Sequence, residues 1–380
     1  MAEIACVFSK TERVNTGPIK KMLGRLRHRG RSKSRIYTLK SAVLGKVNHL
    51  VENEVELKES GPVVVADGKI FNDDCSTSPE EIISEFYKGN GEEFVHSLDG
   101  AFAFALADGE KFLAARDPLG LKPLYYTESG ESLAFASEIK ALVDMGEDIK
   151  IFPPGYYYSS ERGFVKYFEA NAVEPFEGIS KDEAASEIRE RLIESVDKNY
   201  EEDKNIGIFL SGGIDSSVIA AAAREVVENL DTFSVGVTGS NDILNARKVA
   251  SHIGARHHEY IYDIDEMLRI LPEVIYHLES FDMFLVRSAV ANYFLSRMAC
   301  YEGKNMIFCG EGGDELFGGY HYLKNLEPSE VEKELIKLTF TGHANGFQRV
   351  DRMTSAFAID GRMPFMNSIV AGYACRLPVE

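Results

Sequence analysis

One segment of the sequence constrains the fold more than any other: an apolar run at residues 206–210 that is followed by Ser211, Gly212 and Gly213. Small residues suited to a helix come next. A buried strand that turns through glycines into a helix directs unpaired backbone N–H groups and the positive end of the helix dipole toward one point, where a phosphate can bind. The glycines allow backbone conformations and a close approach that side chains would block. The segment therefore predicts a strand–loop–helix unit that binds a nucleotide phosphate.

The side chains of this loop favour the same interpretation. Ser211 and Ser216 would add hydroxyl donors, whereas Asp215 would be repelled by bare phosphate and makes sense mainly as a magnesium ligand. No Gly-Lys-Ser/Thr follows, so the segment does not match the Walker pattern. The alternative is an ordinary glycine-rich turn capped by serine. The strand, the Ser-Gly-Gly-x-Asp-Ser spacing and the helix together favour nucleotide binding over that alternative.

A second glycine-rich segment, residues 309–320, carries acidic side chains directly after a predicted strand. Ligands of open α/β sheets bind at the carboxyl ends of the strands, so Asp215 and Asp314 are expected to share a Mg²⁺ ion with the phosphates of ATP. Glu311 would then be available as a general base, or for electrostatic work on the incoming nucleophile. The alternative is a flexible acidic surface loop, which the companion phosphate loop disfavours.

The first half of the chain has a different pattern from the second. Up to residue 167, short apolar runs alternate with Gly, Pro and Asp, which predicts antiparallel strands joined by hairpin turns. Two of these turns are expected at Asp67-Gly68 and Asp108-Gly109. One helix is expected at residues 78–87, with Ser78 as its N-cap and Pro79 in its first turn.

From residue 182 onward, helical stretches such as 182–200 alternate with short strands, which predicts a parallel sheet covered by helices on both faces. The expected strands are 206–210, 232–237 and 306–309. The intervening residues lack any period and contain Pro and Gly. We therefore expect a first domain at 1–167, a linker at 168–181 and a second domain at 182–380.

Composition and charge disfavour several classes of protein. The 42 Lys and Arg residues against 60 Asp and Glu give a net charge of −18, so a nucleic-acid partner is not expected; the basic cluster at residues 25–35 is a local exception. Five scattered cysteines form no Cys-x-x-Cys pair, so neither a disulfide framework nor a zinc site is predicted. We find no signal-peptide pattern and no apolar run that could span a membrane, and we expect a cytoplasmic protein without a membrane partner.

Motifs in both halves resemble the glutamine-dependent asparagine synthetases. The synthetase domain of that family is resembled by the acidic loop together with residues 276–279, 352–356 and 359–367. Its glutaminase-type domain is resembled by residues 28–30, 97–104 and 115–126. The resemblance implies an Ntn-hydrolase-type α+β sandwich followed by a doubly wound ATP-pyrophosphatase domain. It also implies that MgATP adenylates the β-carboxylate of aspartate, which ammonia then attacks.

The resemblance assigns roles to individual positions. Leu210, Val235 and the pair Cys309-Gly310 correspond to contacts with adenosine, and Ser211, Gly212, Gly213 and Ser216 to the phosphate loop. Asp215 and Asp314 correspond to the magnesium ligands, and Glu311 to the residue tied to forming the acyl-adenylate. In the related β-lactam-forming synthetases a tyrosine takes that last position, so Glu311 favours an external amine over ring closure.

The first half departs from the family where glutamine would be hydrolysed. The family nucleophile is a cysteine exposed as the first residue after removal of Met, but here position 2 is Ala2, and Cys6 is expected to be a buried strand cysteine. The family's Asn-Gly-Glu is replaced by Asp67-Gly68-Lys69, which puts an acid where a developing oxyanion needs a donor. Arg29 remains, although its partner acid near Ser78 does not. We therefore expect no glutaminase activity, and ammonia or another amine as the nitrogen source.

Three interpretations stay open. The first is an ammonia-dependent asparagine synthetase or a close amide-forming relative. The second is an adenylating enzyme for another substrate, of the β-lactam-synthetase or tRNA-modifying type. The third is a degenerate protein that acts by binding or regulation, since the chain ends at Glu380 before the family's further helices and their phosphate-binding lysine. A homodimer is compatible with each. The paired histidines His257-His258 are expected to be structural, because neighbouring strand residues point to opposite faces.

Overall fold

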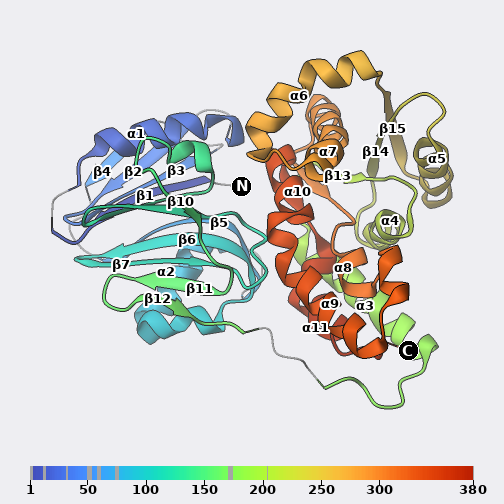
Figure 1. Cartoon of the computed structure of the whole chain (residues 1–380), viewed down its shortest axis with the longest axis horizontal. Coiled ribbons are helices and arrows are strands. Elements are labelled where there is room, and N and C mark those ends of the chain that lie inside the picture. Colours follow the sequence, from blue (N-terminus) through green and yellow to red (C-terminus); the bar gives the residue numbers. More distant parts are fainter. Residues whose placement is uncertain are drawn as a thin grey trace. The chain divides into compact units, whose positions relative to one another are not determined.

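The computed structural model describes residues 3–11, 14–30, 33–48, 54–57, 61–72, 77–169, 174–202 and 204–379 of the 380-residue chain. The chain divides into two compact units, Met1–Glu169 and Ala170–Glu380, whose elements are labelled in Figure 1. The division lies inside the segment expected to be a linker, of which residues 170–173 are outside the described part. No helix among the described residues is long and apolar enough to cross a membrane.

The first unit contains two sheets. The seven-stranded sheet has the order β10-β8-β9-β1-β3-β2-β4 and is antiparallel except where β2 pairs with β4. Its strands are β1 (Glu3–Ser9), β2 (Lys33–Thr38), β3 (Ala42–Asn48), β4 (Glu54–Leu57), β8 (Tyr125–Ser129), β9 (Ser132–Ala136) and β10 (Ile149–Ile151). The five-stranded sheet is antiparallel and has the order β12-β11-β7-β6-β5. Its strands are β5 (Val63–Ile70), β6 (Gly100–Asp108), β7 (Lys111–Arg116), β11 (Tyr156–Ser159) and β12 (Gly163–Lys166).

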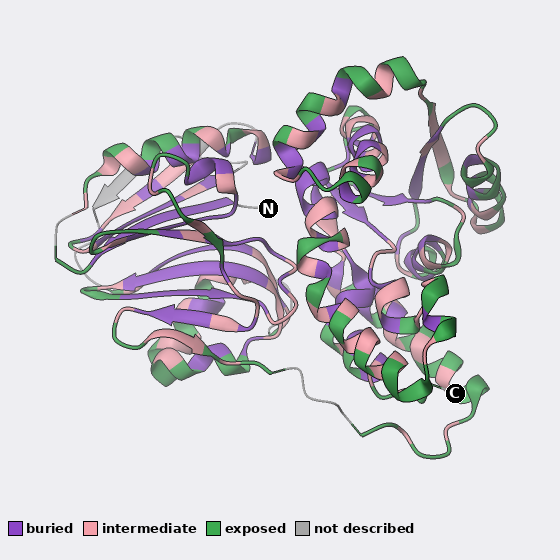
Figure 2. Cartoon of the chain, viewed as in Figure 1, coloured by how far each residue is buried: buried purple, intermediate pink, exposed green. Residues whose placement is uncertain are grey.

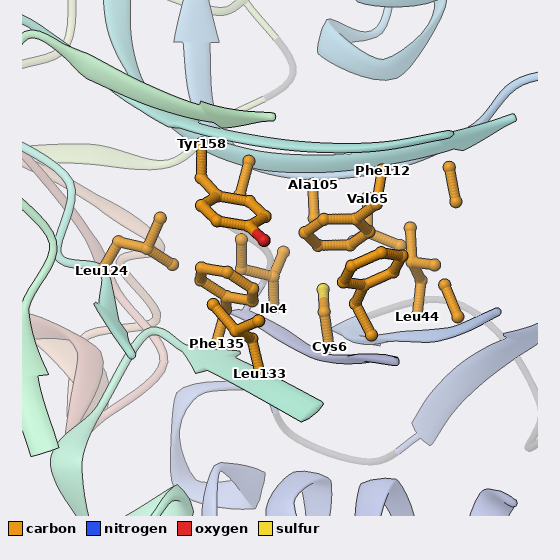
Figure 3. Packing of buried hydrophobic residues seen from close by; sticks show 14 of the residues in the cluster. Ile4, Cys6, Leu44, Val65, Ala105, Phe112, Leu124, Leu133, Phe135 and Tyr158 are labelled. Carbon is orange, nitrogen blue, oxygen red and sulfur yellow. The ribbon is translucent and has the colours of Figure 1, made fainter. Parts of the chain in front are cut away.

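The two sheets pack face to face, and one helix covers each outer face. Figure 3 shows Ile4 and Cys6 of β1 with Phe112 of β7 in the core between the sheets. Because successive strand residues point to opposite faces, the alternate residues of β1 pack instead against α1 (Thr16–Arg25). The outer face of the second sheet is covered by α2 (Pro79–Asn90). The first unit is therefore a helix–sheet–sheet–helix sandwich, as expected.

The hairpin predicted at Asp67-Gly68 is wrong, whereas the hairpin at Asp108-Gly109 is confirmed between β6 and β7. The strand β5 runs unbroken from Val63 to Ile70, and its Gly68 pairs with Phe102. A Cβ on Gly68 would lie 1.9 Å from the carbonyl oxygen of Ala101, and its φ is +113°. This glycine permits a close approach between neighbouring strands rather than a turn.

The second unit is built on a parallel sheet with the order β15-β14-β13-β16-β17. Its strands are β13 (Ile206–Phe209), β14 (Asp231–Gly236), β15 (Arg256–Ile261), β16 (Met306–Phe308) and β17 (Asp360–Arg362). Its helices are α3 (Lys181–Asn199), α4 (Ile214–Val226), α5 (Asn241–Ile253), α6 (Ile264–Leu278), α7 (Met283–Tyr301), α8 (Gly313–Phe317), α9 (Pro328–Thr341), α10 (Gly346–Ser355) and α11 (Ser368–Ala374). Short 3-10 turns in the two units are η1 (Arg27–Arg29), η2 (Gly91–Ser97), η3 (Ile139–Ala141), η4 (His321–Asn325), η5 (Gly342–Ala344) and η6 (Pro364–Met366).

Local sequence accounts for most of these boundaries. The helix α2 begins after Ser78, which forms a capping box with Glu81, and α3 begins after Ser180, which does the same with Glu183. The strands β13 and β16 are buried along their whole length, because helices cover both faces of a parallel sheet; Figure 2 shows β13 in the colour of buried residues. The predicted parallel sheet with covering helices is confirmed.

The adjacent histidines of β15 have structural partners. The His257 ring lies 2.8 Å from the Thr232 hydroxyl and 3.0 Å from the Ser234 hydroxyl, on β14. The His258 ring lies 2.7 Å from the carboxylate of Asp231, which also pairs with Lys304. Each ring ties the edge strand to its neighbour, which agrees with the structural role expected for the pair.

Candidate nucleotide and acceptor site

Two glycine-rich loops meet at one edge of the parallel sheet. The first connects β13 to α4 and the second connects β16 to α8, and β13 and β16 are paired neighbours. The loops are in direct contact, since a Cβ on Gly310 would lie 2.7 Å from the backbone nitrogen of Ser216. A Cβ on Gly313 would lie 2.5 Å from the carboxyl carbon of Asp215. The glycines of the second loop thus let the first loop approach closely enough to form one site.

The first loop has the geometry of an anion-binding turn. Gly212 has a φ of +75°, and a Cβ there would lie 2.5 Å from the backbone nitrogen of Ala246. The N-cap of α4, Gly213, offers no side chain to the helix terminus, which leaves the N–H groups of the first turn without a side-chain cap. The hydroxyl of Ser216 accepts a hydrogen bond from the Ser211 nitrogen at 3.2 Å and lies 3.0 Å from the Ser211 hydroxyl. The two serines therefore hold each other at the mouth of the loop.

Four carboxylates gather beside this turn, and their roles differ. Glu315 accepts hydrogen bonds from the Gly312 nitrogen at 3.1 Å and from the Tyr320 hydroxyl at 2.6 Å, so it stabilises the second loop. Glu311 forms an ion pair of 3.0 Å with Arg349. Among the described residues, the carboxylates of Asp215 and Asp314 have neither a hydrogen bond nor an ion pair.

The electrostatics of the cluster favour a cation. Burial raises the pKa of Asp215 to about 6, with a further contribution from the negative charges of Asp314, Glu315 and Glu311. Burial and the charge of Glu311 also raise the pKa of Asp314. No group of three or more His, Cys, Asp or Glu side chains that could enclose a metal exists in the described part of the chain. Mg²⁺ is commonly held by one or two carboxylates plus substrate phosphates, so the two aspartates fit that ion.

A cavity of about 610 Å³ opens over both loops. Its lining includes eight of the residues expected from sequence: Leu210, Ser211, Asp215, Ser216, Val235, Gly310, Glu311 and Asp314. Gly212, Gly213 and Cys309 do not line it. The thiol of Cys309 is buried, and burial raises its pKa well above the ordinary value.

Several residues that line the cavity were not predicted from the sequence. The α7 helix contributes Ser288 and Asn292, and the start of α10 contributes Gly346 and Arg349. Arg349 lies one turn before the 352–356 motif and belongs to no pattern of its own. No local motif in the sequence indicated these positions.

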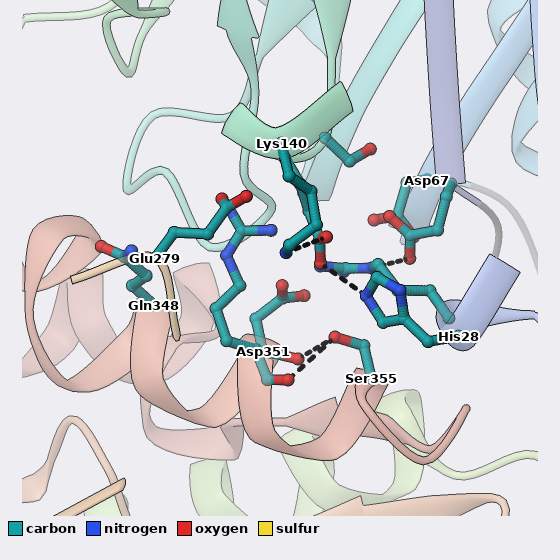
Figure 4. Close-up of polar contacts among 12 residues, drawn as sticks. His28, Asp67, Lys140, Glu279, Gln348, Asp351 and Ser355 are labelled. Atoms are coloured by element: carbon teal, nitrogen blue, oxygen red, sulfur yellow. Dashed lines mark hydrogen bonds and ion pairs between the residues drawn. The ribbon is translucent and has the colours of Figure 1, made fainter. Parts of the chain in front are cut away.

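Buried charged residues surround Arg29 in the first unit, where the family resemblance would place a glutamine pocket. The Arg29 guanidinium pairs with Glu3 at 2.5 Å and with Glu138 at 2.9 Å. Glu138 also lies 2.5 Å from the Lys140 ammonium and 3.1 Å from the His28 ring; Figure 4 labels His28 and Lys140.

In the second unit, Figure 4 labels Asp351 and Ser355, and the Ser355 hydroxyl donates to the Asp351 carbonyl.

Of the two residues that bear on the missing nucleophile, the structure describes Cys6 but not Ala2. Cys6 is fully buried between the sheets, as expected, and burial raises the pKa of its thiol. Asp67 is buried, and its carboxylate lies 3.9 Å from the Lys122 ammonium.

Comparison with known proteins matches both units. The Asparagine synthase family profile matches residues 187–337, and the Glutamine amidotransferase domain profile matches residues 1–151. The chain is 34% identical to Asparagine synthetase B [glutamine-hydrolyzing] of Escherichia coli over 99% of its own length and 75% of that relative. It is 32% identical to Asparagine synthetase [glutamine-hydrolyzing] 2 of Arabidopsis thaliana, over 94% of the chain and 67% of the relative. A probable asparagine synthetase of Schizosaccharomyces pombe is 36% identical over 76% of the chain and 56% of the relative.

The profile matches contain both glycine-rich loops of the second unit, and in the first unit the whole seven-stranded sheet and the strands β5, β6 and β7. The chain therefore belongs to the family of glutamine-hydrolysing asparagine synthetases, with an amidotransferase domain followed by an asparagine synthase domain.

Proposed function

We propose that the second unit uses ATP to activate a carboxylate, that of aspartate, and then joins the activated carbon to ammonia. The observation that carries the proposal is the contact between the two glycine-rich loops. It brings the carboxylates of Asp215 and Asp314, which have no partner among the described residues, to the N-terminus of α4, where a phosphate would bind. Membership of the asparagine synthetase family supports the same chemistry.

In this proposal the two loops and the strand β14 divide the binding of the nucleotide among them. Leu210, Val235 and the backbone of Cys309 and Gly310 hold the adenosine, while Ser211, Gly212, Gly213 and Ser216 bind the phosphates, the two glycines through backbone N–H groups. Asp215 and Asp314 would hold Mg²⁺, which would supply positive charge against the phosphates of ATP. Without that cation, the acids around Asp215 would repel a triphosphate.

Two displacements complete the reaction. A carboxylate oxygen of the acceptor attacks the α-phosphorus of ATP, the bond from that phosphorus to the bridging oxygen breaks, and pyrophosphate leaves. Ammonia then attacks the acyl carbon, and the carbon–oxygen bond to AMP breaks. Glu311, which lines the cavity beside these groups, accepts the proton that the nitrogen loses.

We further propose that the first unit does not hydrolyse glutamine. Ala2 replaces the cysteine nucleophile of the family. The guanidinium of Arg29, which the family resemblance assigns to the glutamine pocket, is ion-paired with Glu3 and Glu138, so a substrate carboxylate would have to compete with two internal ones. The buried Asp67 would oppose an oxyanion. Ammonia or another free amine is then the nitrogen donor.

Isotope exchange between ATP and labelled pyrophosphate tests the adenylation step. Exchange that depends on L-aspartate and Mg²⁺ is expected, because acyl-adenylate formation is reversible before the amine arrives. Exchange with a different carboxylate would instead indicate another adenylating enzyme. Absence of exchange with every acceptor, in protein that still binds ATP, would indicate a protein that acts by binding.

The nitrogen source is tested separately by measuring amide product with ammonium chloride or with glutamine. We expect product with ammonium alone, and no glutamate released from glutamine above a protein-free blank. A glutamine-analogue electrophile such as 6-diazo-5-oxonorleucine should leave the protein mass unchanged. Glutamate release, or a stoichiometric mass increase, would refute the proposed loss of glutaminase activity.

A further inference from the structure

The cavity extends beyond the two loops that would hold the nucleotide. Its lining also includes residues of α7, of the end of α9 and of the start of α10, with Ser288, Asn292, Asn345 and Gly346 among the polar or small ones. A Cβ on Gly346 would lie 3.8 Å from Glu311 and 3.9 Å from Arg349, so this glycine leaves room beside both side chains. An acceptor molecule would lie here, next to the proposed base.

The charges that line the cavity are strongly unequal. Six acids line it: Asp215, Asp242, Asp282, Glu311, Asp314 and Glu315. Among the described lining residues, Arg349 is the one Lys or Arg side chain. An acceptor with two carboxylates would be repelled by every charged group except Arg349.

The Arg349 guanidinium has N–H donor capacity that could bind a carboxylate of such a ligand. Its Nη1 donates to the Ser288 hydroxyl at 2.9 Å, and its Nη2 donates to Glu311 at 3.0 Å. Its buried Nε has no hydrogen-bond partner among the described residues. A guanidinium carries five N–H donors in a planar fork that matches a carboxylate, and a buried donor without a partner is unfavourable.

We propose that Arg349 recognises the second carboxylate of a small dicarboxylate acceptor, the one that is not adenylated. This inference rests on the proposed function of the site and adds the residue that selects its acceptor. The acceptor carboxylate takes the place of Glu311 on the guanidinium, while Ser288 keeps the arginine anchored to α7. Glu311 is thereby released from its ion pair when the acceptor is bound, which makes its carboxylate available for the proton of the amine.

Direct binding tests the proposal without catalysis. Isothermal titration in Mg²⁺ and the non-reacting analogue α,β-methylene-ATP compares L-aspartate with β-alanine, which keeps the reacting carboxylate and the amine but lacks the other carboxylate. The wild type should prefer aspartate. In R349Q, aspartate affinity should fall about 10- to 100-fold, the cost of losing charged hydrogen bonds. Affinity for β-alanine and for the nucleotide analogue should stay within about threefold.

The matched control is Arg297→Gln. Arg297 lies in the same unit with a similar exposure of 25% against 20%, and it forms an ion pair of the same 3.0 Å length with Glu266, outside the cavity lining. R297Q should keep the aspartate affinity. If R349Q does not fold, R349K replaces it, and the preference for aspartate should fall less because the charge remains without the fork.

Several outcomes overturn the proposal. Equal losses of aspartate and β-alanine in R349Q would mean that Arg349 acts only by shaping the cavity or holding Glu311. An unchanged aspartate affinity, or a wild type that binds the nucleotide analogue but not aspartate, would also exclude this recognition. If the wild type binds no nucleotide, the proposed function is refuted instead. Titration of aspartate in the absence of nucleotide would then still test whether Arg349 recognises the second carboxylate.

Discussion

Replacing Asp215 by asparagine should make the ligand-free protein more stable while removing its response to MgATP. The pKa of the Asp215 carboxyl is raised from 3.8 to about 6 by burial and by three neighbouring acids. Each pH unit of such a difference corresponds to about 1.4 kcal/mol, so the ionised carboxylate costs the folded state about 3 kcal/mol at pH 8 before solvent screening. Asp215 is half-buried, and it also gains about 0.5 kcal/mol from the first turn of α4. The net gain expected for D215N is about 1–2 kcal/mol.

The stability that D215N gains over the wild type should increase with pH. Because the folded-state pKa is raised, the folded protein binds more protons than the unfolded chain between about pH 4 and pH 6, and its stability falls as the pH rises through that window. The advantage of D215N should therefore be complete above about pH 6, shrink below it and vanish below about pH 4. For a unit of this size, 1–2 kcal/mol corresponds to a rise in Tm of about 2–8 °C.

The assay is thermal and urea unfolding of the full chain in EDTA, followed by circular dichroism at pH 8, 6 and 4. Hydrogen exchange of the β13 amides assigns the change to the second unit. Asp242→Asn is the matched control, since Asp242 also lies in the first turn of a helix that follows a parallel strand. Addition of MgATP should raise the Tm of the wild type but not of D215N. A variant that is no more stable than the wild type at pH 8, or whose advantage does not change with pH, would refute the reasoning.

Three further substitutions test other contacts. Gly212→Ala should destabilise the protein by about 2 kcal/mol or more and abolish ATP binding, because φ is +75° and the Cβ would meet Ala246; thermal unfolding and nucleotide titration check this. Ser216→Ala should raise KM for ATP about tenfold with a smaller change in kcat, since one hydroxyl of the phosphate loop is lost, and steady-state kinetics measure it. Hydrogen bonds from basic partners such as Lys304 outweigh the effect of burial and hold the pKa of Asp231 below its ordinary value. Its stabilisation is therefore complete above about pH 4 and is lost only as the pH falls toward the depressed folded-state pKa, so Asp231→Asn should cost about 3 kcal/mol at pH 7 and clearly less at pH 2 in urea unfolding.

The parts of the fold that were predicted correctly depend on short-range rules. Cys6 was expected to be buried in a strand, and the start of α2 was predicted from Ser78 as its N-cap and Pro79 in its first turn. The strands β13 and β16 were found because continuous apolar runs between helical stretches are typical of a parallel sheet. The edge at which their loops meet follows from the direction of those strands.

The wrong hairpin prediction and the site residue that was not predicted both depend on contacts between segments that are far apart in the sequence. Gly68 carries the same local pattern as a hairpin glycine, and only its approach to the Ala101 carbonyl shows that it belongs inside a strand. Arg349 has no motif, and it becomes part of the site because α10 packs beside the acidic loop. Local sequence cannot distinguish such cases, because the deciding neighbour is contributed by another element.

The sequence by itself determined the strand–loop–helix units, their order and the chemical types of the residues at the loops, since these follow from periodicity, capping and the conformational freedom of glycine. Only the tertiary structure decided that Asp215 and Asp314 have no partner in the described part of the chain, that Glu311 is held by Arg349, and that the Arg29 guanidinium is neutralised within its own unit. The physical reason is that burial and charge interactions depend on distance through space, and folding brings together carboxylates and guanidinium groups that the chain separates widely.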